Sequence, residues 1–173
     1  CSSDLITAER SALVTALNPL VANNYKALNE TKPAQITYKF TGAESESEFA
    51  NKLQEVQYQE VERGTTLIGP HRDDLLLQLG EFPAKGFASH GESWSFAISL
   101  KVAALEMFKA QGMDPILILD DVFAELDTSR RERLIFATRL TEQTIVTAAV
   151  EGDLPDELGG VRFYVAGGKV EVR

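Results

Sequence analysis

The chain has 173 residues, of which 44% are hydrophobic and 25% are charged, an ordinary balance for a globular protein with one substantial core. Its 17 basic and 26 acidic side chains give a formal charge of −9, which excludes DNA binding through overall charge and leaves a local patch, another subunit or further sequence for that task. Cys1 is the single cysteine, and no apolar run approaches the roughly 20 residues that span a bilayer, so we expect no internal disulfide framework, no membrane partner and a cytoplasmic location.

The first part of the chain is predicted to be mainly helical. Apolar residues recur at helical intervals over residues 3–30, and Pro19 should kink or divide this helix because proline removes a backbone hydrogen bond. Apolar and polar residues then alternate over 36–40, as in a half-buried strand. A second amphipathic helix is expected over 49–61, closed by Gly64. These elements show no chemistry of their own and are typical of an accessory lobe.

A polar turn follows at residues 69–74, where the chain reads Gly-Pro-His-Arg-Asp-Asp before a short apolar strand. A histidine, an arginine and two aspartates so close together indicate either a metal or nuclease site or a polar loop. In the polar loop, Arg72 would pair with Asp73 or Asp74. Local chemistry favours the polar loop.

A long helix is predicted next, and its start is a candidate anion site. Residues 89–93 read Ser-His-Gly-Glu-Ser, and apolar residues then recur at helical spacing from Trp94 until Gly112 ends the helix. A serine and a glycine at a helix start leave backbone N–H groups free at the positive end of the helix dipole, which favours an anion. The alternative is an ordinary N-cap, in which Ser89 or Ser93 satisfies the first turn.

The central feature of the sequence is the segment 115–127, Pro-Ile-Leu-Ile-Leu-Asp-Asp-Val-Phe-Ala-Glu-Leu-Asp. The aliphatic run 116–119 has no polar alternation and predicts a strand buried on both faces, in a parallel sheet with helices above and below. Asp120 and Asp121 follow at the strand end, the edge at which open α/β sheets bind ligands. An aliphatic run ending in Asp is the Walker B pattern of phosphate-loop ATPases, whose first Asp holds Mg²⁺. The alternative is that these acids only cap the next turn.

The C-terminal part is predicted to complete a compact domain. Residues 129–132 fit a capping box at a helix start, and a second apolar strand covers 144–146. Alternation after Val161, with Gly167-Gly168 as a two-residue turn, predicts a terminal β-hairpin. A basic cluster either contacts DNA phosphates or pairs with nearby acids, and the second role is favoured because surface charge runs are usually solvated. The cluster is Arg130, Arg131 and Arg133, and the acids are Glu132 and Glu142.

Three motifs resemble the C-terminal half of RecF, a bacterial DNA replication and repair family of the SMC-like ABC ATPase class. They are residues 69–74, residues 87–92 (Phe-Ala-Ser-His-Gly-Glu) and residues 116–131. The resemblance covers most of the chain and implies an α/β fold, the C-terminal part of a P-loop NTPase head of the ABC/SMC-like type. Central parallel strands flanked by helices are expected, with part of an α-helical lobe at 1–68, the head at 69–173 and a terminal β-hairpin.

The phosphate loop of such ATPases is missing from the sequence. No Gly-x-x-x-x-Gly-Lys-Ser/Thr occurs, and the chain opens with Cys1 rather than Met. We therefore expect the chain to be the C-terminal part of a longer protein and to be inactive as an ATPase by itself.

The resemblance implies roles for individual residues around ATP and Mg²⁺, the expected cofactors. Asp120 coordinates Mg²⁺, and Asp121 occupies the place of the catalytic carboxylate that orients the attacking water. Ser89 and Gly91, at the position of the ABC signature motif, contact the γ-phosphate of an ATP held by the opposite subunit. Glu92 lies beside them.

Two further positions, and two departures from the family pattern, complete the expected site. Asp127 ends the D-loop at the dimer interface and is expected to cap the following helix. Thr147 stands at the position of the switch residue, where ABC proteins often have a histidine. The family often has Gln-x-Arg where this chain has Glu92-Ser93-Trp94, so a basic contact is absent or supplied elsewhere.

The resemblance also implies a function for the full-length protein. We expect an ATP-dependent homodimer with weak ATPase activity that binds single-stranded and gapped duplex DNA. We expect it to act with RecO and RecR in recombinase loading, recombinational repair and the SOS response.

Two other functions compete with this interpretation. A nucleotide-binding subunit of another ABC-type ATPase, such as a membrane transporter, would have Glu at position 121, a following Pro and a His near position 147, and all three are missing. A metal-dependent nuclease would need the acids of the 69–74 turn and those after residue 119 within about 4 Å of a shared metal pair. The predicted layout places them on separate elements. The agreement of three motifs in order and spacing favours the RecF-type function.

Overall fold

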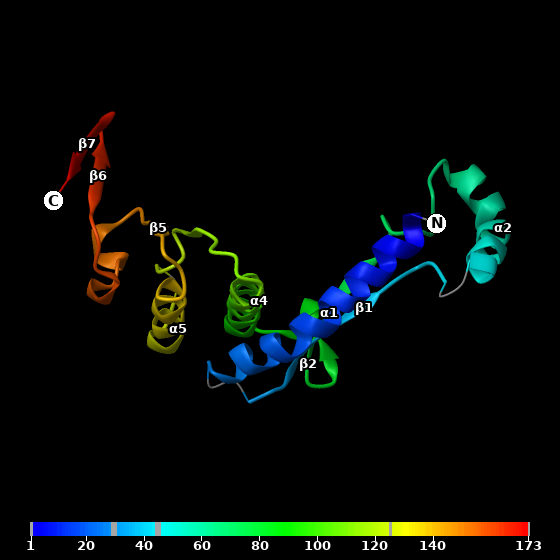
Figure 1. Cartoon of the computed structure of the whole chain (residues 1–173), viewed down its shortest axis with the longest axis horizontal. Coiled ribbons are helices and arrows are strands. Elements are labelled where there is room, and N and C mark those ends of the chain that lie inside the picture. Colours follow the sequence, from blue (N-terminus) through cyan, green and yellow to red (C-terminus); the bar gives the residue numbers. More distant parts are fainter. Residues whose placement is uncertain (1, 29–30, 44–45, 125, 173) are drawn as a thin grey trace. The chain divides into compact units, whose positions relative to one another are not determined.

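The computed structural model describes residues 2–28, 31–43, 46–124 and 126–172 (Figure 1). They form two compact units, Cys1–Met107 and Phe108–Arg173, here called the N-terminal and C-terminal units. The division expected between residues 68 and 69 falls inside the N-terminal unit, because strands on both sides of it pair in one sheet. The assignment of a lobe and a head to these ranges stays a prediction.

The N-terminal unit combines helices with a three-stranded antiparallel sheet. Its elements are α1 (Ser2–Lys26), β1 (Ala34–Lys39), α2 (Glu46–Arg63), β2 (Asp74–Leu79), β3 (Phe82–Pro83), the single turn α3 (Ala84–Phe87) and α4 (His90–Ala110), whose last residues lie beyond the unit. The strand order is β1-β2-β3, with Ile36 opposite Leu77 and Ala34 opposite Leu79. Burial alternates along β1, as the sequence predicts for a half-buried strand.

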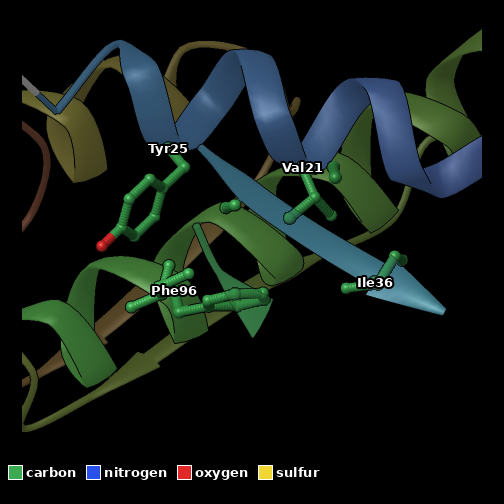
Figure 2. Packing of buried hydrophobic residues seen from close by; sticks show 7 residues of the cluster. Val21, Tyr25, Ile36 and Phe96 are labelled. Carbon is green, nitrogen blue, oxygen red and sulfur yellow. The ribbon is translucent and has the colours of Figure 1, made fainter. Parts of the chain in front are cut away.

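The core of this unit is formed where α1, β1, β2 and α4 meet (Figure 2). Val21 and Tyr25 of α1 pack with Ile36 of β1 and Phe96 of α4, each at most 3% exposed. The ring centroids of Tyr25 and Phe96 lie 5.8 Å apart, and the rings are tilted against each other, within the range of geometries that aromatic pairs prefer. Packing on α1 and the sheet therefore fixes α4, the helix whose start is a candidate site.

Pro19 lies inside α1 without dividing it. The helix is a single element from Ser2 to Lys26, so of the two expected effects of Pro19, a kink or a division, the division is wrong. Beside the proline, the Asn18 side-chain oxygen accepts a hydrogen bond from the Ile36 amide at 2.9 Å, and Val21 is fully buried. Contacts with β1 therefore offset the backbone hydrogen bond that proline cannot make.

The second predicted helix, α2, forms as expected, but none of its apolar residues is fully buried. It ends before Gly64, whose φ of 61° is the left-handed conformation common after helices. Leu53 is 40% exposed and Val61 is 76% exposed. Its amphipathic pattern therefore predicted the helix correctly but not a packed face.

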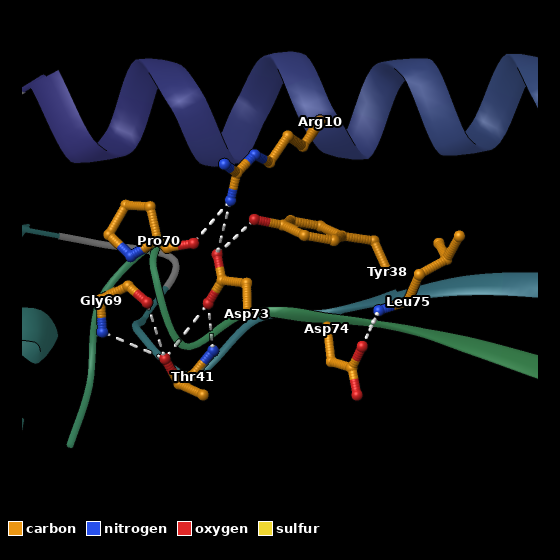
Figure 3. Close-up of polar contacts among 8 residues, drawn as sticks. All are labelled: Arg10, Tyr38, Thr41, Gly69, Pro70, Asp73, Asp74 and Leu75. Carbon is orange, nitrogen blue, oxygen red and sulfur yellow. Dashed lines mark hydrogen bonds and ion pairs between the residues drawn. The ribbon is translucent and has the colours of Figure 1, made fainter.

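Asp73 connects three parts of the N-terminal unit (Figure 3). Its side chain is only 2% exposed. One oxygen accepts a hydrogen bond from the Thr41 amide at 2.8 Å, and the other accepts one from the Tyr38 hydroxyl. Arg10 of α1 lies 3.9 Å from the second oxygen and also donates to the Pro70 carbonyl at 2.6 Å. The carboxylate therefore holds α1, β1 and the 69–74 turn together.

The environment keeps Asp73 charged. Burial alone would raise the pKa of Asp73, but the hydrogen bonds from Tyr38 and Thr41 and the charge of Arg10 outweigh it, so the pKa lies below its ordinary value of 3.8. A buried carboxylate with several partners is stabilising only while it is ionised.

The 69–74 turn is the polar loop that local chemistry favoured, although the expected partners of Arg72 are wrong. Arg72 donates to the Thr66 carbonyl at 2.7 Å and to the Thr65 hydroxyl at 2.6 Å, rather than to the neighbouring aspartates. Asp74 accepts a hydrogen bond from the amide of Leu75 at 2.8 Å.

The C-terminal unit is built on a two-stranded parallel sheet, β4 paired with β5, and carries an antiparallel hairpin. Its elements are β4 (Leu117–Asp120), α5 (Thr128–Thr138), β5 (Thr144–Thr147), the 3₁₀ turns η1 (Glu151–Asp153) and η2 (Asp156–Leu158), β6 (Phe163–Ala166) and β7 (Lys169–Val172). The predicted terminal hairpin is confirmed, with Gly167 and Gly168 at φ of 55° and 75° in the turn, as a two-residue hairpin turn of this kind requires. Among the described residues, no helix is long and apolar enough to cross a membrane.

One face of the parallel sheet is exposed. Leu119 is 7% exposed, whereas Ile118 is 63% and Ile145 is 45% exposed. The parallel pairing predicted for the 116–119 run is confirmed, but the expectation that both faces are buried is wrong for this chain. An unbroken aliphatic run does not reveal how many strands and helices surround it, and here only alternate side chains are covered.

Truncation of Phe96 tests the core. We expect Phe96→Ala to lower the free energy of unfolding by about 3–5 kcal/mol, because a buried aromatic side chain is removed and a cavity remains. Phe82→Ala is the control, because Phe82 is 57% exposed and stacks only on Phe87 among its described ring contacts; it should cost about 0.5–1.5 kcal/mol. Urea unfolding followed by circular dichroism measures both, and equal losses would contradict the core assignment.

The Asp73 contacts predict that the difference in the free energy of unfolding between the wild type and Asp73→Asn depends on pH. Asp73→Asn should destabilise the protein at neutral pH by about 1–3 kcal/mol, because charge-assisted hydrogen bonds become neutral ones. The pKa of Asp73 is lowered in the folded state, so its contribution is complete above the unfolded value of 3.8 and disappears as pH falls through the lower folded value. The gap between wild type and variant in urea unfolding should therefore narrow below pH 3.8. Asp74→Asn, at an exposed neighbour, should show no such gap at any pH.

Candidate functional site

Asp120 and Thr147 meet at the end of the parallel sheet. They are paired residues at the carboxyl ends of β4 and β5, and both are exposed. The Thr147 hydroxyl donates a hydrogen bond to Asp120 Oδ1. Parallel pairing thus brings the predicted metal ligand and the predicted switch residue together at the edge where α/β sheets bind ligands.

Asp121 leaves the strand in an uncommon backbone conformation. Its φ is 51°, the single positive value at a non-glycine residue among the described residues. Its amide donates to the Thr147 carbonyl at 3.1 Å, and one carboxylate oxygen accepts from the Ala149 amide at 3.3 Å. Aspartate tolerates this conformation better than most residues. The turn therefore points the Asp121 side chain away from the direction of the strand. Uncommon backbone conformations of this kind are often found at functional sites.

The side chains at this edge fit a magnesium ion that is shared with phosphate oxygens. Asp120, Asp121 and Thr147 offer only oxygen atoms, which Mg²⁺ prefers, and Mg²⁺ is usually held by one or two carboxylates with water and substrate phosphates in its other positions. In the part of the chain that the structure describes, no group of three or more His, Cys, Asp and Glu side chains could hold a metal ion by itself. A nuclease-type metal cage, which would also use Asp73, is therefore not supported.

Ser89 and Glu92 form a reciprocal capping box at the start of α4. The Ser89 amide donates to Glu92 Oε2 at 2.8 Å, and the Glu92 amide donates to Ser89 Oγ at 3.2 Å. The Ser93 hydroxyl donates to the Ser89 carbonyl at 2.9 Å. The N-cap interpretation is therefore confirmed. It is compatible with an anion site, because the first amides of a helix, among them that of Gly91, have no acceptor within the helix.

A lysine from another part of the N-terminal unit joins this capping box. Lys32 donates to Glu92 Oε1 at 2.7 Å. The hydrogen bond from Lys32, followed by that from the Ser89 amide, lowers the pKa of Glu92 to about 2. Glu92 is therefore ionised at any physiological pH, and its two oxygens have different partners.

His90 and Trp94 lie one helical turn apart at the same helix start. Trp94 Nε1 donates to His90 Nε2 at 3.0 Å, with the rings in an edge-to-face arrangement. Trp94 stands where the family often has a basic residue, and here its indole contacts the imidazole next to Ser89. Trp94 thus makes a local hydrogen bond, while a cation from another segment, Lys32, contacts Glu92 at the same helix start.

Asp127 caps α5, which is one of the two roles expected for it; the other is a place in the D-loop at the dimer interface. Its Oδ1 accepts from the Arg130 amide at 3.0 Å, and its carboxylate pairs with the Arg130 guanidinium. The helix consequently begins at Thr128, and the capping box expected over 129–132 is wrong. Asp127, one residue before the helix, accepts the hydrogen bond from the first-turn amide in place of Ser129.

The other two arginines of the basic cluster also have partners near them in the chain. Arg131 donates to the Phe123 carbonyl at 3.3 Å, and the Arg133 guanidinium lies 5.0 Å from the ring centre of Phe136. These contacts support the structural interpretation of the cluster. Pairing of the cluster with Glu132 and Glu142 stays a prediction.

Apart from Asp127, which caps α5, the predicted site residues fall into two groups, one in each unit. Asp120, Asp121 and Thr147 gather at the end of the parallel sheet, and Ser89, Gly91 and Glu92 gather at the start of α4. Sequence reasoning missed Lys32, whose partner is 60 residues away. A solitary lysine between a predicted helix and a predicted strand carries no local pattern that could have identified it.

No protein-family model matches the chain, but several curated full-length proteins are similar to it. The DNA replication and repair protein RecF of Streptomyces avermitilis is 47% identical over 174 residues, 96% of this chain and 47% of the relative. The RecF proteins of Rhodococcus erythropolis and Frankia alni are 44% and 45% identical, over 92% and 97% of this chain and 44% and 48% of each relative. The chain therefore spans about half the length of the curated relatives it matches.

Solved structures show the same fold. The recombination mediator protein RecF with ATP, from the RecFOR pathway, superposes with a TM-score of 0.79 at 21% identity, over 99% of this chain and 47% of that chain. An SMC head bound to the C-winged helix domain of ScpA gives a TM-score of 0.53 at 13% identity, over 92% of this chain and 42% of that chain. Both likenesses support an SMC-like ATPase-head fold, and the identity of 44% to 47% with three RecF proteins over nearly all of its length shows that the chain belongs to the RecF family.

Proposed function

We propose that the complete gene product is a DNA replication and repair protein of the RecF type, an ATPase that dimerises around ATP and binds DNA. The observation that carries this proposal is the meeting of Asp120 and Thr147 at the carboxyl edge of a parallel sheet. In a chain of the RecF family, that edge is the expected place for the Mg²⁺ and phosphate groups of a nucleotide.

At this edge, the three side chains have separate tasks in the proposal. A bound Mg²⁺ would supply positive charge next to the phosphate groups of the nucleotide. Asp120 would hold the ion, and the Thr147 hydroxyl fixes the orientation of the Asp120 carboxylate through its hydrogen bond. Asp121 orients the attacking water and accepts its proton, with one oxygen held by the Ala149 amide and the other left for the water.

The start of α4 acts on a second nucleotide. Ser89 and Gly91 bind the γ-phosphate of an ATP held by a second copy of the protein, where the Gly91 amide and the helix dipole favour negative charge. Glu92 keeps Ser89 in place through the capping box rather than contacting the phosphate, since its two oxygens already have partners. Two such contacts, one from each copy, make dimerisation depend on ATP, with Asp127 of the D-loop near the interface.

The DNA substrate, the protein partners and the cellular location are proposed because the chain belongs to the RecF family. A weak ATPase that dimerises on ATP suits a protein that recognises single-stranded and gapped duplex DNA and then releases it. RecO and RecR are the proposed partners in recombinase loading and in the SOS response, and the cytoplasm is the proposed location. With a formal charge of −9, the chain needs a local basic patch or further sequence to hold DNA phosphates.

Removal of the Asp121 charge tests the catalytic role. Asp121→Asn should slow ATP hydrolysis by roughly 10²–10⁴, the usual effect of losing a general base, while ATP-dependent dimers persist longer. Steady-state phosphate release measures the rate, and analytical ultracentrifugation with ATP measures the dimers. Asp156→Asn is the control, because the side chain of Asp156 is 99% exposed. Unchanged turnover in Asp121→Asn would exclude this residue from catalysis.

A bulky cation at Ser89 tests the contact with the second nucleotide. Ser89→Arg should abolish ATP-dependent dimerisation, because the side chain fills the space next to the γ-phosphate. The Kd of the monomer for ATP should change by no more than about two-fold, which is less than the tenfold change that 1.4 kcal/mol produces. Ala97→Arg places the same side chain at an exposed position of the same helix and should dimerise normally. Sedimentation and nucleotide titration distinguish the two effects, and normal dimers of Ser89→Arg would refute the role of this helix start.

A further inference from the structure

Lys32 lies outside every motif of the sequence but contacts the capping box at the start of α4. Its ammonium group lies 2.7 Å from Glu92 Oε1, across 60 residues of sequence. The Lys32 side chain is 54% exposed and that of Glu92 is 19% exposed, so the pair lies at the surface with the carboxylate the more protected partner. An exposed pair of this kind contributes little to stability by itself. Its importance depends on what it holds.

The pair holds Ser89. Glu92 Oε2 accepts from the Ser89 amide at 2.8 Å while Glu92 Oε1 accepts from Lys32. With both oxygens engaged, rotation of the carboxylate away from Ser89 also breaks the contact with Lys32. A glutamine at position 92 would still complete a capping box, but it would lack the charge that matches the ammonium group. The lysine thus gives a reason for glutamate at this position.

The backbone beside Lys32 is itself anchored. The carbonyl of Pro33, the next residue, accepts a hydrogen bond from the Gly80 amide at 2.8 Å. Ala34 then begins β1, is 4% exposed and pairs with Leu79. The ammonium group therefore extends from a segment fixed to the sheet, and it transmits the position of that sheet to the first turn of α4.

We propose that Lys32 is a positioning residue, which holds the Glu92 carboxylate so that Ser89 is correctly placed to meet the ATP of a second copy. The inference rests on the proposed function for the contact itself, whereas the placement of Ser89 by Lys32 is a property of this chain alone. Lys32 acts through Glu92, which remains ionised across the physiological range.

The placement is tested by hydrogen exchange on the complete gene product without nucleotide. Lys32→Met should raise exchange in peptides covering residues 87–94 about two- to five-fold, the range expected for loss of an exposed ion pair. Glu92→Gln should give a similar rise, and the double variant should be no worse than either single variant, because all three lose one interaction. Lys32→Arg should restore protection. Lys101→Met, at an exposed lysine of α4 with no ion pair among the described residues, should leave exchange unchanged.

The consequence for function is tested by the ATP concentration that gives half-maximal dimerisation. Lys32→Met and Glu92→Gln should raise it about two- to five-fold, and Lys32→Arg should return it to the wild-type value. Ser89→Arg serves as the reference for complete loss.

The outcomes separate the inference from the proposed function. Normal dimers of Ser89→Arg would refute the proposed contact, and the exchange measurement would still decide whether Lys32 places Ser89. If Ser89→Arg blocks dimerisation while Lys32→Met changes neither exchange nor dimerisation, the inference is overturned. Faster exchange in Lys32→Met with unchanged dimerisation would also overturn it, because the lysine would then support only the helix start. Additive effects in the double variant would show that Lys32 and Glu92 act separately.

Discussion

The candidate chemistry of this chain depends on the parallel register of β4 and β5. A shift of that register by one residue would move Asp120 away from Thr147 and reverse the faces of one strand. The observed pairing places both residues at the last position of the sheet and joins them by a hydrogen bond. The turn that follows then aims Asp121 in a different direction from the strand. Two adjacent carboxylates thereby acquire different surroundings and can take different roles.

The N-terminal unit uses charge for a different purpose. Asp73 and Glu92 both have lowered pKa values, and in both cases hydrogen bonds between distant segments are responsible. Asp73 is nearly inaccessible to solvent and stabilises the packing of α1 against the sheet. Glu92 is at the surface and orders the first turn of a helix. Similar carboxylates thus serve the fold in one place and the candidate site in the other, according to their burial and partners.

The sequence predicted the elements well where the pattern was long or the turn chemistry specific. The half-buried strand β1, the long helix α4 and the Gly167-Gly168 turn are each present in the structure, because local periodicity and glycine backbone conformations are determined by a few adjacent residues. The parallel pairing was also predicted correctly, from an aliphatic run that ends in two acids.

Several failures concern contacts between distant residues, whereas the capping box expected over 129–132 failed locally because Asp127 caps α5. Pro19 does not end α1, because β1 supplies contacts that no local pattern reveals. Arg72 has threonine partners rather than aspartates, since Asp73 is taken by Tyr38, Thr41 and Arg10. For the candidate site, the sequence identified the residues at the strand end and the helix start. It did not identify Lys32, whose role exists only after the fold brings it to Glu92.

The left-handed backbone at Asp121 affects how loss-of-function variants at that position can be interpreted. Asparagine adopts this conformation nearly as readily as aspartate, so exchanging the acid for its amide isolates the effect of the charge. Alanine or valine would combine that effect with a local conformational penalty of roughly 1–2 kcal/mol, which could disturb the hydrogen bonds to Thr147 and Ala149. An inactive alanine variant would therefore not distinguish a missing proton acceptor from a displaced loop.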